Sequence, residues 1–143
     1  MKVRGYASIF RNVDLAGEVV SPGAFSEWIG ANPQKNLQIF WNHSHIYSAS
    51  AKPIGMTTGV KQDRKGLYFE GELNDTAEGL EVQKLLDQGP IEASFAFRVD
   101  ADEIKKGVRH LKALSPFEIT AASFGMNPEA YIEAIPDQEE TEQ

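Results

Sequence analysis

The sequence predicts an α+β domain built mainly on an antiparallel, barrel-like β-sheet with two or more inserted helices. Runs in which apolar and polar residues alternate, as they do in half-buried strands, recur along most of the chain. Two other segments carry the apolar spacing and the boundary residues of short helices. Many strands with two helices inserted between them are typical of this fold class. We expect strands at residues 3–10, 37–43, 53–62, 66–73, 91–99, 107–114, 117–124 and 130–135, and helices at 23–29 and 74–89.

The first third of the chain contains two of these strands and one helix. Residues 3–10 are rich in β-branched and aromatic side chains, which favour strands. Ser21 and Pro22 then supply a cap and a first-turn proline for the helix over residues 23–29. The second strand alternates apolar with polar residues and ends at His43.

The middle of the chain predicts a hairpin followed by a helix. The two strands of the hairpin, within residues 53–73, are joined by a polar turn in which Gly66 is free to adopt a positive φ. Asn74 or Asp75 can cap the helix, and Gly89, which precedes a proline, ends it. The side chains expected to face inward from this helix are Ala77, Leu80, Val82 and Leu85.

The last third of the chain predicts further strands followed by an acidic end. Residues 91–99 alternate throughout between apolar side chains and polar or small ones. Two more strand-like runs follow, and the final strand ends at residue 135. No repeat or low-complexity block precedes the acidic end of the chain. We therefore expect a single domain over residues 1–135 and a disordered acidic tail over residues 136–143.

Composition narrows the classes of function. The chain has 143 residues and no cysteine, which excludes a disulfide framework, a thiolate zinc site and a cysteine nucleophile. It has 21 acidic and 14 basic residues, a net charge of −7, and no basic patch of the kind that binds a phosphate backbone. No apolar run is long enough to span a bilayer. We expect a soluble, intracellular protein that binds neither nucleic acid nor membrane.

Ser94 is the candidate nucleophile. It lies in the strand over residues 91–99 on the face opposite the apolar row, so its hydroxyl is expected to point away from the packed side. A serine nucleophile needs a base within hydrogen-bond reach and usually a third group that orients the base. Without such partners, Ser94 would be an ordinary solvent-facing strand serine.

Three histidines are available as the base. His43 follows the inward alternation of its strand, which places its imidazole at the rim of the core. His45 would face the same side if the strand continued, so the pair also suggests a metal site. A catalytic zinc site needs three protein ligands, and only His110 or an unassigned carboxylate is left to complete this one. A partly buried histidine bonded to a backbone carbonyl is the plain alternative.

Glu118 is the candidate group that orients the base. It alternates with Phe117 and Ile119 and is therefore expected on the opposite, more polar face of its strand. A carboxylate there can accept the imidazole Nδ1–H and stabilise the imidazolium that forms when the serine loses its proton. Spacing alone does not choose Glu118, because other carboxylates are equally available by composition. These include Asp14, Glu70, Glu72 and Glu92.

A series of short motifs runs through about residues 3–134. They are GYASIF (5–10) followed by Asp14, VVSPGAF (19–25), FWNH (40–43), PIG (53–55), GEL (71–73), IEASFAF (91–97), FEIT (117–120) and GMNPEA (125–130). In their order and number, these motifs resemble the prohead serine protease family of tailed bacteriophages, the maturation proteases that clear scaffold segments from the immature capsid. Where that family commonly has a glycine and a serine, this chain has Ala96 and Thr120.

The resemblance implies a Ser-His-Glu triad in which His43 is the general base, Ser94 the nucleophile and Glu118 the third member. It also implies a fold similar to the herpesvirus assembly protease, an antiparallel barrel with surrounding helices. That protease uses a second histidine as its third member, so His45 or His110 stays open as an alternative to Glu118. The resemblance implies no cofactor and no metal.

The implied function is that of a prohead maturation serine endopeptidase, which acts by acyl transfer. Its partners would be the major capsid protein with its scaffold segment, and other copies of the same chain, inside the assembling prohead in the host cytoplasm. The acidic tail would be a site of self-trimming. Two rivals stay open, namely a catalytically inactive scaffold or binding module of the capsid interior with the same fold, and a metal-dependent hydrolase that uses His43 and His45.

Overall fold

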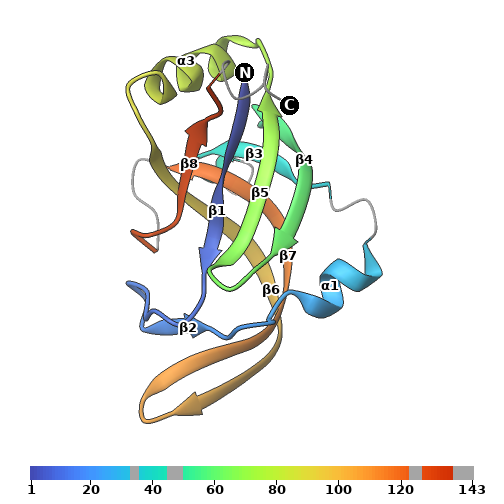
Figure 1. Cartoon of the computed structure of the whole chain (residues 1–143), viewed down its shortest axis with the longest axis vertical. Coiled ribbons are helices and arrows are strands. Elements are labelled where there is room, and N and C mark those ends of the chain that lie inside the picture. The colour runs from blue at the N-terminus through green and yellow to red at the C-terminus, as the bar shows by residue number, and fades with distance from the viewer. Residues whose placement is uncertain (33–35, 45–49, 123–126, 137–143) are drawn as a thin grey trace.

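The computed structural model describes residues 1–32, 36–44, 50–122 and 127–136 and contains a closed β-barrel (Figure 1). Seven of the described strands follow one another around the barrel in the order β7-β3-β4-β5-β1-β8-β6, and β6 pairs with β7 to close it. The short strand β2 adds to β7. Most pairings are antiparallel, which confirms the predicted α+β class and its barrel-like sheet. The strands are β1 (Lys2–Ile9), β2 (Glu18–Val20), β3 (Gln38–Trp41), β4 (Gly55–Gln62), β5 (Gly66–Leu73), β6 (Ile91–Lys105), β7 (Val108–Ala122) and β8 (Tyr131–Ala134).

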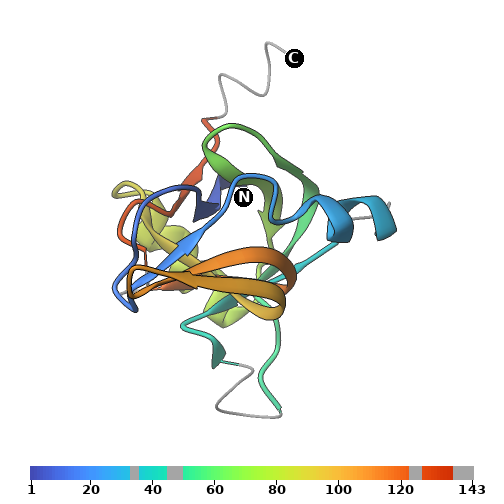
Figure 2. The ribbon, with the colours of Figure 1, turned by 90° about the horizontal axis from the view of Figure 1, so that it is seen from below.

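Strand β7 pairs with three other strands. One edge pairs antiparallel with β6 along its length, and the other edge pairs in parallel with β2 near its beginning and with β3 near its end. The alternation of side chains contains no information about these two parallel pairings, since they join segments far apart in the sequence. Beyond the barrel, β6 and β7 continue as a long hairpin, and Figure 2 views the molecule from the end at which this hairpin projects.

Strand β7 is continuous over 15 residues, so the prediction of two separate strands at 107–114 and 117–124 was wrong. Its register with β6 skips Phe117, which is left as an extra residue in a β-bulge next to Pro116. Proline has no N–H for a strand ladder and is therefore tolerated at bulges. The bulge lets the strand pass through this proline, and it leaves Phe117 58% exposed.

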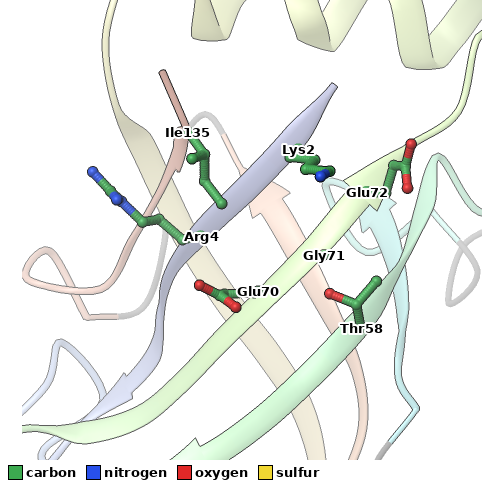
Figure 3. A pocket seen from close by; sticks show the side chains of 7 residues that line it. All are labelled: Lys2, Arg4, Thr58, Glu70, Gly71, Glu72 and Ile135. Carbon is green, nitrogen blue, oxygen red and sulfur yellow. The ribbon is translucent and has the colours of Figure 1, made fainter. Parts of the chain in front are cut away.

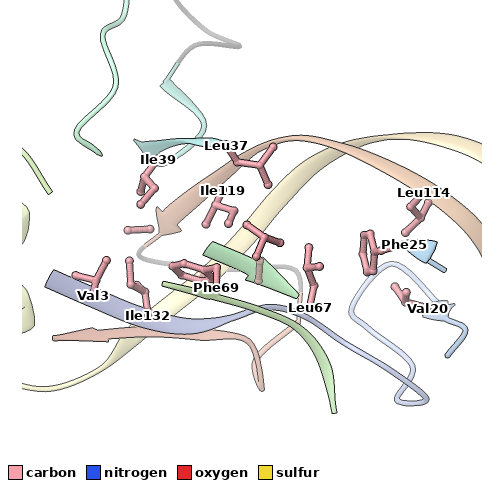
Figure 4. Packing of buried hydrophobic residues seen from close by; sticks show 14 of the residues in the cluster. Val3, Val20, Phe25, Leu37, Ile39, Leu67, Phe69, Leu114, Ile119 and Ile132 are labelled. Carbon is pink, nitrogen blue, oxygen red and sulfur yellow. The ribbon is translucent and has the colours of Figure 1, made fainter. Parts of the chain in front are cut away.

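Side chains from most of the strands meet in one core inside the barrel (Figure 4). Ile39, Phe69 and Ile119, from β3, β5 and β7, are completely buried there. Burial of each such side chain contributes about 1.5–3 kcal/mol. Phe25, which precedes the first helix, stacks on Phe10 with ring centroids 6.2 Å apart. The core therefore extends from the barrel to the segment that leads into this helix.

The first helix, α1 (Ser26–Ala31), begins three residues later than predicted. Gly23 has a φ of +80°, in the left-handed region, so the chain makes a turn where the first helical turn was expected. The Ser26 N–H donates to the Gly23 carbonyl at 3.1 Å within this turn. Ser21 therefore does not cap the helix, and no other side chain does.

The second helix, α3 (Ala77–Leu86), lies within the predicted range. Its N-cap is Thr76, whose Oγ accepts the Gly79 N–H at 3.2 Å, and not Asn74 or Asp75 as predicted. Asn74 instead accepts the Thr76 hydroxyl at 2.6 Å and so orients the capping residue. Neither described helix has the length and apolarity of a membrane span.

The buried face of α3 differs from the predicted one. Gly79, Val82 and Leu86 face the protein. A Cβ at Gly79 would lie 2.4 Å from a carbonyl oxygen of the preceding loop, so only glycine allows this face to pack so closely. The residues expected inward but found exposed are Ala77, Leu80 and Leu85.

The β4–β5 hairpin forms as predicted, but Gly66 has a different role from the expected one. It does not adopt a positive φ. A Cβ on Gly66 would lie 1.9 Å from the Ser8 carbonyl oxygen of the neighbouring strand β1. Glycine is therefore required here by the close approach of β1 and not by the geometry of the turn.

The substitution Gly66→Ala is expected to lower the free energy of unfolding by more than about 2 kcal/mol, because the new methyl group meets backbone that is held in a strand pair. Urea unfolding followed by circular dichroism measures this change. Gly30→Ala is the control, since nothing lies within 4 Å of a Cβ at that helical position. It should leave the stability unchanged or raise it by up to about 1 kcal/mol. Equal stability of the two variants would contradict the role given to Gly66.

Candidate active site

The chain turns sharply after β3, and this turn fixes His43. Asn42 and His43 have φ values of +49° and +52°, which residues other than glycine rarely adopt. Two hydrogen bonds at 2.8 Å hold the turn against β7: the Asn42 N–H donates to the Ala121 carbonyl, and the His43 N–H donates to Thr120 Oγ. The strand was expected to extend to His43 but ends at Trp41, so the turn positions the imidazole, which is 27% exposed.

Glu118 is only 1% exposed on β7, so the face of the strand that was expected to be polar is buried. All residues from 118 to 122 are buried, because this part of β7 is covered on both faces. Glu118 Oε1 lies 2.8 Å from His43 Nδ1. Burial of a carboxylate is costly unless a hydrogen-bonding partner compensates, and the imidazole N–H is such a partner. With Nδ1–H donated to Glu118, the ring keeps Nε2 as an acceptor.

Ser94 lies on the same face of the β6–β7 ribbon as Glu118. In the strand register Ser94 is opposite Thr120, and Ala96 is opposite Glu118, while alternate residues of a strand share a face. Ser94 is half-buried and lines, together with His43, one cavity of about 280 Å³. The structure thus brings the three predicted residues together, with His43 in contact with Glu118 and sharing a cavity with Ser94.

The cavity lies where β8 begins. Tyr131, the first residue of β8, pairs with Tyr6 of β1 and with Glu92 of β6. The next residues along those two strands, at positions 7–8 and 93–94, lie beyond the end of β8 and line the cavity. The hollow therefore lies next to the end of one short barrel strand.

Asn127 also lines the cavity and forms part of a link between two loops. It exchanges amide hydrogen bonds with Asn12, at 3.0 Å in one direction and 2.8 Å in the other. Asn12 bonds Glu129 in addition. These contacts tie the segment that follows β1 to the segment that precedes β8, on the border of the cavity.

Of the other two histidines, His110 lies in the described part of β7. His110 is opposite Glu103 and next to Val19, eight positions along β7 from Glu118, a separation of roughly 26 Å at the rise of a β-strand. It therefore does not reach His43. His45 lies outside the described residues. Within the described ranges, no group of three or more histidine, aspartate or glutamate side chains is placed to hold a metal ion.

Thr120 is a functional candidate that the sequence did not assign. It is completely buried, and its Oγ accepts the His43 N–H and lies 3.1 Å from the Phe40 carbonyl, to which it donates. One hydroxyl thus joins β7, β3 and the turn that carries the imidazole. A signal was present in the sequence, because a residue two positions after Glu118 on a strand shares its face.

A second hollow, of about 290 Å³, lies over the outer surface of β1, β4 and β5 (Figure 3). Exposed side chains of both charges line it, among them Lys2, Glu70 and Glu72. Arg4 in its wall pairs with Glu133 at 3.4 Å. None of His43, Ser94 and Glu118 lines this hollow, so we locate the candidate chemistry in the cavity of His43 and Ser94.

The structure and the sequence are both similar to known proteases. Among solved structures, the KSHV protease in complex with a hexapeptide phosphonate inhibitor matches with a TM-score of 0.57 and 12% sequence identity, covering 92% of this chain and 63% of that one. This likeness concerns the fold alone and confirms the predicted similarity to the herpesvirus protease barrel.

The prohead protease of Enterobacteria phage HK97 is 32% identical over 138 residues, which cover 92% of this chain and 58% of the relative. The chain thus spans a little more than half the length of this curated relative. The family model described as caudovirus prohead serine protease matches residues 1–143. Since this match extends over the whole sequence, the chain belongs to the caudovirus prohead serine protease family.

Proposed function

We propose that this chain is a serine endopeptidase of prohead maturation that cleaves the scaffold segment of the major capsid protein with a Ser-His-Glu triad. One observation carries this assignment: His43, which contacts the buried carboxylate of Glu118 at 2.8 Å, lines the same cavity as Ser94. A hydroxyl, an imidazole and a carboxylate in this order form the constellation of nucleophile, base and orienting group.

The reaction proceeds by acyl transfer. Ser94 Oγ attacks the carbonyl carbon of the scissile peptide bond, while His43 Nε2 takes the hydroxyl proton. The tetrahedral intermediate then collapses, the C–N bond breaks, and His43 returns the proton to the leaving amine. Water, activated by the same imidazole, hydrolyses the ester on Ser94 and regenerates the free hydroxyl.

Glu118 acts on the imidazole and does not touch the substrate. Its acceptance of Nδ1–H fixes the tautomer, and its negative charge stabilises the imidazolium that exists during both halves of the reaction. Because Glu118 is buried, water screens this attraction less than it would at the surface. The attraction between the buried carboxylate and the ring therefore acts mainly after the serine proton has moved to the imidazole.

The partners and the place of action are part of the proposal. The substrates are the scaffold segment of the major capsid protein and the acidic tail of the chain itself, of which residues 137–143 lie outside the described ranges. Cleavage takes place inside the assembling prohead in the host cytoplasm, where copies of the chain associate. The rival function, an inactive scaffold or binding module of the capsid interior, would retain the fold but would not require the Ser94 hydroxyl.

The first test removes the proposed nucleophile or base. Ser94→Ala and His43→Ala should each abolish processing of co-expressed major capsid protein, while circular dichroism shows an intact fold. A fluorophosphonate should label wild-type protein at Ser94, as read by peptide mass spectrometry. Ser115→Ala is a matched control, because Ser115 is also a β-strand serine but bonds Asp100 away from the cavity. Full processing by either active-site variant would overturn the assignment and favour the scaffold module.

The second test distinguishes Glu118 from a second histidine. Glu118→Gln should slow processing by about 100- to 10,000-fold, because the amide cannot stabilise the imidazolium. His45→Ala should change the rate little, and so should His110→Ala. Single-turnover cleavage rates measure all three. The opposite ranking would indicate a Ser-His-His arrangement.

The third test concerns Thr120 as a positioning residue. Thr120→Val removes the hydroxyl that accepts the His43 N–H and should slow processing about tenfold or more, whereas Thr120→Ser should restore most of the rate. Both rates are compared with the free energy of unfolding, which Val should reduce by about 1–3 kcal/mol. If Thr120→Val is destabilised but processes normally at a temperature where it is folded, Thr120 has no positioning role.

A further inference from the structure

The cavity beside Ser94 has two chemically different parts. An apolar wall is formed by side chains of Val20, Phe95, Phe97 and Leu111. Two carboxylates, Asp14 and Glu18, also line it, and no lysine or arginine is among the described lining residues. A ligand with both an apolar part and a positive charge would match these two parts.

Asp14 presents one carboxylate oxygen that no other described residue uses. Its Oδ1 accepts the backbone N–H groups of Ala16 and Glu18 at 2.9 and 3.0 Å, which holds the side chain in a fixed position. Within the described part of the chain, Oδ2 accepts no hydrogen bond. The charge of Asp14 is therefore fixed in position and has no ion-pair partner among the residues that the structure describes.

Glu18 is paired, but its ion pair leaves negative charge in excess. Glu18 Oε2 lies 2.8 Å from Arg109 Nη1, and Arg109 Nε lies 2.7 Å from Asp102 Oδ2. The hydrogen bonds that Arg109 donates to Asp102 and then to Glu18 hold the pKa of its guanidinium above its usual value, so it stays charged. Together with Asp14, Glu18 and Asp102 make three carboxylates to one guanidinium. The net charge at this end of the cavity is therefore negative.

Ser8 gives an observation that is independent of the carboxylates. It lines the cavity, is only 3% exposed, and its Oγ has no hydrogen-bond partner among the described residues. A buried hydroxyl without a partner is unfavourable, and native proteins rarely retain one unless a ligand or water completes it. Ser8 therefore points to a polar group that enters the cavity from outside the protein.

We propose that this cavity is the specificity pocket for the substrate side chain next to the cleaved bond, and that it takes a long basic side chain. This inference rests on the proposed function. A volume of about 280 Å³ lies just below the range of sites for whole small molecules, which is about 300–1,000 Å³, and suits one side chain. The apolar wall contacts the methylene groups, Ser8 Oγ accepts a hydrogen bond from the cationic head, and Asp14 and Glu18 compensate its charge.

The experiment uses the full chain and a peptide library in which every position is varied, with cleavage products identified by mass spectrometry. Wild-type protein should cleave next to lysine or arginine at least tenfold faster than next to methionine, and about 100-fold faster than next to glutamate. The measured quantity is the ratio of kcat/KM for a matched lysine and methionine peptide pair.

Two variants remove charge and retain the hydrogen bonds. Asp14→Asn keeps an oxygen for the two backbone N–H groups, and Glu18→Gln keeps an oxygen for Arg109. Each should lower the lysine-to-methionine ratio at least tenfold. Glu103→Gln is the matched control, because Glu103 is an acidic residue outside the cavity on the β6–β7 hairpin. It should leave the ratio at the wild-type value.

Ser8→Ala separates binding from folding. Loss of the hydroxyl should lower the ratio severalfold, yet the stability should be unchanged or raised, since no bond within the described protein is lost. Cleavage with no preference for basic residues, or a preference that survives in Asp14→Asn with Glu18→Gln, would overturn this inference while leaving Ser94 as the nucleophile. Absence of all cleavage together with absence of fluorophosphonate labelling at Ser94 would instead overturn the proposed function, and this inference with it.

Discussion

The contact between His43 and the buried carboxylate of Glu118 is the interaction on which the site depends. A carboxylate with 1% exposure has lost its water, so the imidazole N–H at 2.8 Å must replace part of that hydration. The same contact holds the imidazole in one orientation on the wall of the cavity. Both the stability of the fold and the proposed catalysis therefore require that His43 and Glu118 stay in contact.

The barrel satisfies this requirement through the position of β7 between β6 and β3. Ser94 comes from β6, Glu118 and Thr120 come from β7, and His43 follows β3, so three neighbouring strands supply the whole constellation. Because side chains alternate between the faces of a strand, a slip of one residue in either pairing would turn Glu118 or Ser94 to the other face. The register of β7 with its two neighbours thus sets the geometry of the site.

Local patterns predicted the strands well, and non-local contacts explain where they were insufficient. Alternation found the strand that carries Ser94, since that pattern depends only on nearby residues, but Ser94 shares its face with the buried Glu118 and Thr120 and not with a solvent-facing row. It assigned Glu118 to a polar face because alternation assumes that one side of a strand meets solvent, whereas β7 is covered on both sides here. The role of Gly66 was missed for a related reason, because the backbone that crowds it belongs to β1, far away in the sequence.

The cavity lies beside the point at which the short strand β8 begins. Strand β8 has four residues and begins at Tyr131, so it separates β1 from β6 only as far as Tyr6 and Glu92. Ser8 of β1 and Ser94 of β6 lie just beyond these last paired residues, and both line the cavity. Alternation predicted the start of this strand to within one residue, but it does not tell which strands pair with it, so the hollow was not foreseeable from alternation. Two of the seven barrel strands, β3 and β8, have only four residues each, and the candidate groups lie at the ends of their pairings: His43 follows β3, and Ser94 lies just beyond the part of β6 that pairs with β8.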